Sequence, residues 1–524
     1  MNARIIYFIL IIQPLLIFSQ SRWTNIYYGD KDAIGKFFIE SYDYGYLITG
    51  KHGHNLVNYC WLIKTNINGE ILWEKTIGEH NTSVNISWMD MNANGNLYLA
   101  GNTSYYDSYR DPLIIKLDSC GEKEWCRVFH TPGNMDYSNM VLATSDGGCV
   151  AVLMYTGYDL GGNIDRLCLA KFSGEGEFLW KQCYNSTDTS LQQPDADHLI
   201  ITPDNGFLVS GICLYKDPDP PHILYNKPYF LKTDSLGNFQ WETVVFKEMG
   251  AEERGHGWTT TLNPSGNYYY SSISHYYYNP YSSSPALVKM DIDGYVLGVY
   301  DLVNGYTYGG LAWAQFISDT VLAASAGWGN DLDSARQYAV LIDTLGNIIN
   351  STLLSSDIYG PKLQVAYDQK LVYMYNTYQN SQFDVYLRKL NQNLEDDTLY
   401  TFPFIYDSLC PYSIVSDTIV QDDCGLIVGM EEVKPDKEEE SSGIIIYPNP
   451  AQNIINIQYP ITNGGCRSII SIYGVFGRKV KEIKLSKGQQ QLKVNVSNWH
   501  NGLYIAVLKD DKKFITKQKF VVLR

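Results

Sequence analysis

The chain has 524 residues and a formal net charge of −16, with 56 acidic against 40 basic side chains. Its length exceeds one ordinary domain, and its acidity argues against a nucleic-acid partner, because phosphate backbones attract basic surfaces. The 43 Tyr, 43 Gly and 14% aromatic residues, with little sign of long amphipathic helices, indicate a nearly all-β protein.

Residues 1–20 have the pattern of a secretion signal peptide. Arg4 supplies a positive charge, Ile5 to Phe18 form an apolar run, and Ser19 and Gln20 provide a small-residue exit. The apolar run is too short for a comfortable membrane span, and no other stretch of the sequence could cross a membrane. We therefore expect an exported protein with no transmembrane segment, secreted or held at the cell surface after passing through the periplasm.

A short phrase then recurs along the chain. In its clearest copy an apolar strand contains Lys116, a turn runs from Asp118 to Gly121, and Trp125 begins the next strand. Asp and Ser favour the turn through hydrogen bonds to the backbone, and Gly accepts the positive φ. The copies are Lys64–Gly69 with Trp73, Lys116–Gly121 with Trp125, Lys171–Gly176 with Trp180, Lys232–Gly237 with Trp241, and the weaker Lys289–Gly294, Leu341–Gly346 and Lys389–Asn391.

The repeat spacing of roughly 50 to 60 residues is typical of propeller blades. A second hairpin signal precedes each copy, as at Asn94–Gly101, which gives about four strands per unit. The copies predict a seven-bladed β-propeller over residues 21–430, with eight blades as the alternative. The repeated Trp residues are expected to fill the contacts between blades.

The N-terminal segment Trp23–Gly29 resembles the outer strand of a blade that has no blade before it. Such a strand can close a ring by pairing with strands from the C-terminal end, which hides two open sheet edges. Ile414–Val420 and Leu426–Met430 are candidate partner strands, or else part of an eighth blade.

A ligand site is expected where the repeat is broken, on loops at one face of the ring. Arg254, His256 and Trp258 alternate with glycines that would let them approach a ligand, although a structured turn also explains this sequence. The Tyr-rich segment containing Tyr276, Tyr277 and Tyr278 is expected in a long loop, where exposed Tyr would suit sugar or protein contacts. Strand alternation would instead bury about half of these Tyr side chains.

The sequence offers no catalytic motif and no zinc-like Cys/His spacing, so we predict no catalytic residue, no metal and no cofactor. Ten Cys in an exported chain permit disulfides. Cys410 and Cys424 flank the last strands before the linker and are predicted to pair. Cys120 with Cys126 is a second candidate, and Cys466 is expected to stay unpaired.

Residues 431–443 are clustered acids without hydrophobic periodicity, which indicates a solvated linker. Beyond them the charge changes sign, with 13 Lys and Arg against 3 Asp and Glu from Gly443 to Arg524. Seven short alternating segments in residues 444–524 predict a small Ig-like β-sandwich.

This tail resembles the type A C-terminal sorting domain of the type IX secretion system, found on Bacteroidetes-type secreted proteins. The matching landmarks are Tyr447, Pro448, Asn449 and Pro450 on entry, Gly477 midway, Gly502 and Tyr504 after Trp499, and Lys517 in the closing strand. Gly474 stands where the family usually has Asp. The resemblance implies that residues 444–524 engage the type IX machinery and direct the chain across the outer membrane.

The repeats resemble more loosely the exported propellers that precede such sorting domains. Their Lys-x-Asp-x-x-Gly-x-x-x-Trp phrase differs in spacing from the similar phrases of quinoprotein-type and sialidase-type propellers. This difference argues against the enzyme activities that those two families would imply. We expect a secreted propeller that binds an unknown protein or glycan. The alternative is an extracellular polysaccharide hydrolase or lyase with its site on one propeller face.

Overall fold

The computed structural model divides the chain into two compact units, residues 1–433 (unit 1) and 434–524 (unit 2), each described here by itself. The structure describes residues 23–27, 33–52, 59–78, 83–105, 109–131, 134–159, 162–186, 188–217, 222–249, 252–277, 282–304, 308–331, 334–355, 361–379, 382–428, 445–447, 449, 451–458, 469–474, 479–485, 491–499, 501–510 and 513–523. The predicted signal peptide and acidic linker lie outside these ranges. Among the described residues, no helix is long and apolar enough to cross a membrane.

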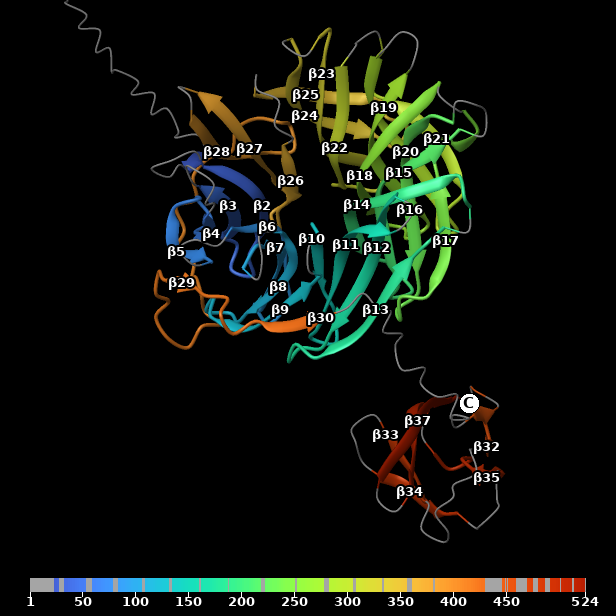
Figure 1. The fold of residues 1–524 in the computed structure, drawn as a ribbon. Coiled ribbons are helices and arrows are strands. Elements are labelled where there is room, and N and C mark those ends of the chain that lie inside the picture. Colours follow the sequence, from blue (N-terminus) through green and yellow to red (C-terminus); the bar gives the residue numbers. More distant parts are fainter. Residues whose placement is uncertain are drawn as a thin grey trace, which may run out of the picture. The chain divides into compact units, whose positions relative to one another are not determined.

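Unit 1 is built from propeller-like repeated sheets, in which strands that follow one another in sequence pair antiparallel (Figure 1). Its one described helix is the 3-10 turn η1 (Lys247–Met249). The first sheet contains β2 (Ile34–Glu40), β3 (Tyr46–His52), β4 (Tyr59–Thr65) and β5 (Ile71–Ile77), and the second contains β6 (Val84–Met91), β7 (Leu97–Thr103), β8 (Asp111–Leu117) and β9 (Lys123–His130). The third sheet contains β10 (Tyr137–Ala143), β11 (Cys149–Asp159), β12 (Gly162–Phe172) and β13 (Phe178–Tyr184), and the fourth contains β14 (Leu191–Ile201), β15 (Phe207–Lys216), β16 (Leu224–Thr233) and β17 (Phe239–Val244). The fifth sheet contains β18 (Glu253–Leu262), β19 (Tyr268–Tyr277), β20 (Ser282–Asp291) and β21 (Val296–Asp301), and the sixth contains β22 (Tyr308–Phe316), β23 (Val321–Gly329), β24 (Arg336–Asp343) and β25 (Ile348–Ser355).

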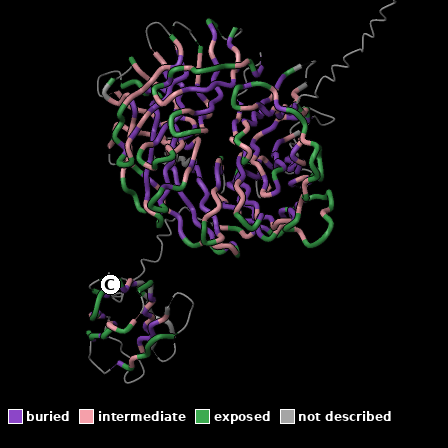
Figure 2. The backbone as a smooth tube through the Cα atoms, turned by 180° about the vertical axis from the view of Figure 1, so that it is seen from behind, coloured by how far each residue is buried: buried purple, intermediate pink, exposed green. Residues whose placement is uncertain are grey.

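The seventh described sheet closes the ring. It joins β26 (Lys362–Val365), β27 (Leu371–Gln379) and β28 (Gln382–Leu390) to the N-terminal strand β1 (Thr24–Tyr27), which pairs with β28. The first strand of each sheet contacts the first strand of the next, and β26 contacts β2 in turn. The prediction that the N-terminal segment closes the ring is therefore confirmed. Figure 2 shows that the buried residues concentrate in the interior of unit 1, with exposed residues around its outside.

The predicted partners of the N-terminal strand were wrong. Residues 395–428, here called the strap, instead run from the seventh sheet to the outer strands of the first two sheets. Within the strap, β29 (Thr418–Ile419) pairs parallel with β5, and β30 (Gly425–Val428) pairs parallel with β9. Each adds a fifth strand to an existing sheet, whereas the partner of β1 is β28.

The strap is fastened by two disulfides, Cys120–Cys410 and Cys126–Cys424, with Cα–Cα distances of 4.9 and 4.7 Å. The predicted Cys410–Cys424 and Cys120–Cys126 pairs are therefore wrong. Because β30 runs beside β9, it brings Cys424 to Cys126, and the preceding strap residues reach the turn at Cys120. A third disulfide joins Cys168 to Cys183 across β12 and β13, and Cys466 lies outside the described residues.

The recurrent phrase forms the same turn in all seven described sheets. One side-chain oxygen at the start of the turn accepts two backbone N–H groups, and a residue with positive φ closes it. In the seventh copy Leu394 takes that position with φ of 64° in place of Gly. The accepting side chains belong to Asn66, Asp118, Ser173, Asp234, Asp291, Asp343 and Asn391.

The Lys and Trp of the phrase hold each repeat together and join it to the next. The buried Lys64, Lys232 and Lys389 pair with carboxylates of the preceding hairpin turn at 2.7–2.8 Å. The ring of Trp180 lies so close to the next sheet that a Cβ on Gly237 would meet it at 2.7 Å. The structural interpretation of the repeated Trp residues is confirmed.

Unit 2 contains two sheets that share one apolar core. One sheet has β31 (Ile445–Tyr447), β32 (Ile454–Gln458) and β35 (Gln491–Asn495), and the other has β34 (Lys479–Lys484), β33 (Ile469–Gly474), β36 (Gly502–Asp510) and β37 (Lys513–Val522). Ile457, Ile470 and Phe520 are fully buried in that core. Alternation of apolar and polar residues, as in β35, turns one face of each strand inward.

Candidate functional site

The first strands of the sheets of unit 1 contact one another around the ring and are here called the inner strands. Six of them carry β-bulges at matching positions, where one or two residues of the inner strand have no partner on the second strand of the sheet. A bulge leaves a residue unpaired and re-aims its side chain. The skipped residues include Lys36, Ser87, Asn139, Asp197, Trp258, Thr259 and Ala312, and all of these line one cavity of about 680 Å³.

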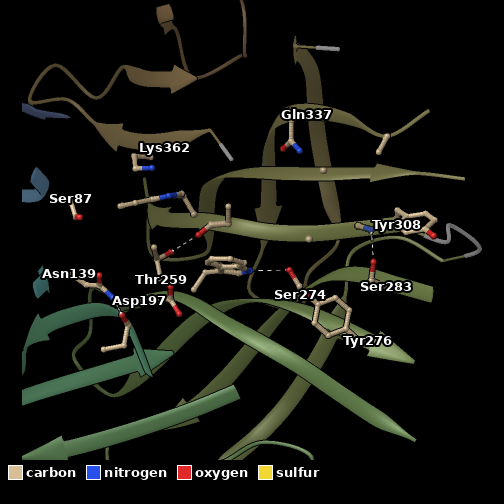
Figure 3. A pocket seen from close by; sticks show the side chains of 18 of the residues that line it. Ser87, Asn139, Asp197, Thr259, Ser274, Tyr276, Ser283, Tyr308, Gln337 and Lys362 are labelled. Carbon is tan, nitrogen blue, oxygen red and sulfur yellow. Dashed lines mark hydrogen bonds between the residues drawn. The ribbon is translucent and has the colours of Figure 1, made fainter. Parts of the chain in front are cut away.

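Aromatic side chains dominate the apolar part of this cavity. Trp258 and Trp313 line it. Tyr276 and Tyr308 line it too, together with Ser, Asn and Gln side chains (Figure 3). Trp88, another lining residue, stacks within 5.7 Å of Trp313. Aromatic surface with a few placed polar groups is the usual composition of a small-ligand site.

An aromatic cluster supports the cavity lining from several sheets. Phe37 stacks on Trp88 at 3.8 Å between ring centroids, and His198 lies edge-on to Trp88 and Trp313. Burial lowers the pKa of His198 to about 3, and its Nδ1 accepts the Thr260 N–H at 3.2 Å. His198 is therefore neutral near pH 7 and acts as a packing residue.

Asp197 and His256 form the polar pair of one cavity wall. His256 Nε2 donates to Asp197 Oδ2 at 2.7 Å, and the His256 ring stacks on Trp258 at 3.9 Å. The Trp258 indole N–H donates to Ser274 Oγ at 2.9 Å (Figure 3). These contacts fix the orientation of the Trp258 face that lines the cavity.

Two lysines, Lys36 on β2 and Lys362 on β26, line the cavity on neighbouring strands. Burial lowers the pKa of Lys362 to about 8, and the charge of Lys36 adds to that effect. Burial also lowers the pKa of Lys36, together with the charges of Lys51 and Arg110. Within the described ranges, neither Lys36 nor Lys362 has a carboxylate in ion-pair distance.

The predicted site residues divide between the cavity and its surroundings. Trp258 and Tyr276 line the cavity, and His256 reaches it through Asp197 and Trp258. Arg254 instead lies 4.3 Å above the Tyr225 ring, and Tyr277 donates to Asp301. Tyr278 lies outside the described residues.

Both segments were expected in irregular structure, and this was wrong, because they form the paired strands β18 and β19. The glycines beside His256 also serve packing. A Cβ on Gly257 would lie 2.6 Å from the Gly211 carbonyl oxygen, so this glycine allows the fourth and fifth sheets to approach.

Asp197, Lys36 and Lys362 were missed because none of them belongs to a local motif whose composition or spacing indicates a ligand site. Their signal is positional, since the cavity-lining residues of the inner strands recur once per repeat. Aligning the units on the turn that follows each inner strand would have placed Lys36 and Asp197 in one column and Lys362 in the next.

One described group of three potential metal ligands, Cys126, Asp423 and Cys424, lies within 4.8 Å. Two of its members are joined in a disulfide and have no free thiolate. This group therefore belongs to the fastening of the strap.

In unit 2 the entry landmark is tied to the last strand. Asn449 Oδ1 accepts the Val521 N–H at 2.8 Å, and Tyr447 Oη accepts a hydrogen bond from Gln491. Tyr504, which follows Gly502 on β36, stacks with Phe520 at 5.6 Å. Lys517 lies on β37, whereas Pro448, Pro450 and Gly477 fall outside the described residues.

Residues 445–523 match the family described as the secretion system C-terminal sorting domain. The resemblance inferred from the tail motifs is confirmed. The domain indicates export of the chain by the type IX system, to the medium or the cell surface, and thus an interaction with that secretion machinery.

A search of curated proteins finds no match. Among solved structures, a protein of unknown function from Dyadobacter fermentans has 9% identity and a TM-score of 0.42, covering 59% of this chain and 96% of that one. Prolyl oligopeptidase B from Galerina marginata has 10% identity and a TM-score of 0.38, covering 83% and 57%. The WD40 domain of SCAP from fission yeast has 7% identity and a TM-score of 0.32, covering 95% and 86%. These likenesses are too distant to indicate an activity.

Proposed function

We propose that this protein is a glycan-binding cargo of the type IX secretion system. Residues 1–20 act as the signal peptide and 21–430 form a seven-bladed β-propeller. Residues 431–443 link it to an Ig-like β-sandwich over 444–524, which delivers the chain. The closed order of seven described sheets supports the blade number, because the late strands β29 and β30 join existing sheets.

The composition of the central cavity carries the binding proposal. A cavity volume of about 680 Å³ is typical of a small-ligand site, and it therefore suits a short saccharide better than a protein surface. Trp258, Tyr276 and Tyr308 offer flat apolar area for sugar rings, and Asn139 and Gln337 offer hydrogen-bonding groups for hydroxyls. A saccharide needs both kinds of contact at once.

A polysaccharide hydrolase is less well supported. Most glycoside hydrolases place two carboxyl groups on either side of the scissile bond. Asp197 is the one acidic residue among the described residues that line the cavity. Asp195 is close to Asp197 but is not among the residues that line the cavity. Its carboxylate accepts a hydrogen bond from the Tyr137 hydroxyl, and its pKa is raised to about 6, mainly by burial and further by the charge of Asp197.

A glycan array probed with the full exported chain tests the proposal. We expect binding to at least one saccharide class and a loss of about tenfold or more in Trp258→Ala, since truncating an aromatic anchor in a binding site costs about 2 kcal/mol or more. Tyr295→Ala is the matched control, because that ring is 70% exposed on an outer hairpin away from the cavity lining. Absence of binding to every saccharide would overturn the proposal, and release of shortened saccharides would favour the hydrolase.

A further inference from the structure

We infer that the saccharide bound in the central cavity is acidic, and that its anionic substituent is held between Lys36 and Lys362. This inference rests on the proposed function and adds the chemical class of the ligand. A sugar carboxylate and a sugar sulfate offer the same negatively charged oxygens, so either could provide the group.

The contrast between the cavity lysines and the repeat lysines motivates the inference. A buried ammonium is costly unless it is paired. Unit 1 meets this requirement at Lys64, Lys232 and Lys389, each of which has a carboxylate at 2.7–2.8 Å. Lys36 and Lys362 are partly buried, lack such a partner in the described part of the chain, and line the cavity.

The groups around these lysines increase the positive charge instead of neutralising it. β2 and β26 lie side by side in the ring, and each supplies one of the two lysines. Lys51 on β3 and Arg110 before β8 act on Lys36 as further positive charges. An anion entering this wall would supply the missing counter-charge for both lysines.

The opposite wall gives the ligand a direction. The inner strands follow one another around the ring in the order β2, β6, β10, β14, β18, β22 and β26. β14 is therefore three strands from β2 in one direction and three strands from β26 in the other. Asp197 on β14 therefore lies across the cavity from the lysines, where His256 already engages it at 2.7 Å. An anionic substituent is repelled by Asp197 and attracted by the lysines, which leaves the sugar ring beside Trp258.

Oligogalacturonate and its methyl ester provide a matched pair of probes, because esterification removes the charge and keeps the ring. Calorimetric titration of the full exported chain at pH 7 should give at least tenfold tighter binding of the acid. Lys36→Gln and Lys362→Gln should each weaken binding of the acid by about tenfold and change binding of the ester by less than twofold. Lys216→Gln, a change at an exposed lysine on β15, is the control.

The outcomes separate this inference from the proposed function. Equal affinity for acid and ester, or equal loss of both in the lysine variants, would overturn the acidic ligand while leaving glycan binding intact. A sulfated saccharide that binds only with both lysines present would support the inference and identify sulfate as the group. If the array also shows no saccharide bound at all, both statements fail. Thermal melting confirms that each variant is folded before titration.

Discussion

Two glycines with nearly the same positive φ angle allow the cost of backbone strain to be distinguished from the cost of disturbed packing between sheets. Gly237 has φ of 77° and the Trp180 ring within 2.7 Å of an added Cβ, whereas Gly266 has φ of 75° and no atom within 4 Å. We expect Gly266→Ala to cost about 1 kcal/mol from left-handed strain alone. Gly237→Ala should cost about 1–3 kcal/mol more, because the ring must move. Melting temperatures of the two variants check this, and equal losses would contradict it.

Lys362 links the proposed ligand site to stability. Burial holds the pKa of Lys362 in the folded protein at about 8, below the ordinary value of 10.5. The charged form therefore costs free energy of folding below about pH 8, and this cost disappears as the pH rises toward 10.5. Lys362→Gln should raise the melting temperature at pH 7 and raise it much less at pH 10.5.

The same variant is expected to lose affinity for an acidic saccharide, as at other sites where function opposes stability. Lys216→Gln, at an exposed position, should change the melting temperature little at either pH. An equal gain for Lys362→Gln at both pH values would contradict the assigned cost of its charge.

At the scale of elements, the strap depends on its disulfides. β29 and β30 contribute only two- and four-residue parallel pairings, which are weak edges on their own. The Cys120–Cys410 and Cys126–Cys424 bonds span 290 and 298 residues, so each removes much chain entropy from the unfolded state. Replacing Cys410 and Cys424 together by Ser should make residues 395–428 the first site of proteolytic cleavage.

The Cys168→Ser, Cys183→Ser double variant is the matched control for this experiment. Its disulfide joins the adjacent strands β12 and β13, which already pair over six residue positions. Proteolysis of the control should leave the strap uncut at the same protease dose. Early cleavage elsewhere in unit 1 of the Cys410 and Cys424 variant would show that the disulfides hold more than the strap.

The sequence predicted the repeated elements, and the N-terminal strand that resembles one of them, but it misplaced the strap. The turn from Asp118 to Gly121 could be recognised because its chemistry returns with the blade period, even where Leu394 replaces the glycine. The strap has no period, and its cysteines pair with partners about 290 residues away, so local spacing misassigned them. In the site, Trp258 and Tyr276 stood out as breaks in composition. Lys36 and Lys362 did not, because one lysine in a strand has many structural explanations.

At the scale of the whole molecule, each unit has a core of its own. The buried cluster around Ile457, Ile470 and Phe520 draws only on residues of unit 2, and the clusters of unit 1 draw on none of them. The sorting-domain match is likewise confined to residues 445–523. Folding of unit 1 and its export can therefore be tested apart.

Deleting Gly443–Arg524 should leave unit 1 folded, with an unchanged melting temperature, but trapped in the periplasm. The reason is that the secretion machinery recognises unit 2, while the cores of unit 1 are complete without it. Phe520→Ala is a subtler form of the same test, because loss of this fully buried ring should cost about 3–5 kcal/mol in a small domain. It should reduce export without altering the saccharide affinity of unit 1. Fractionation of cells and medium measures both effects, and normal release of the truncated chain would show that unit 2 is not the export signal.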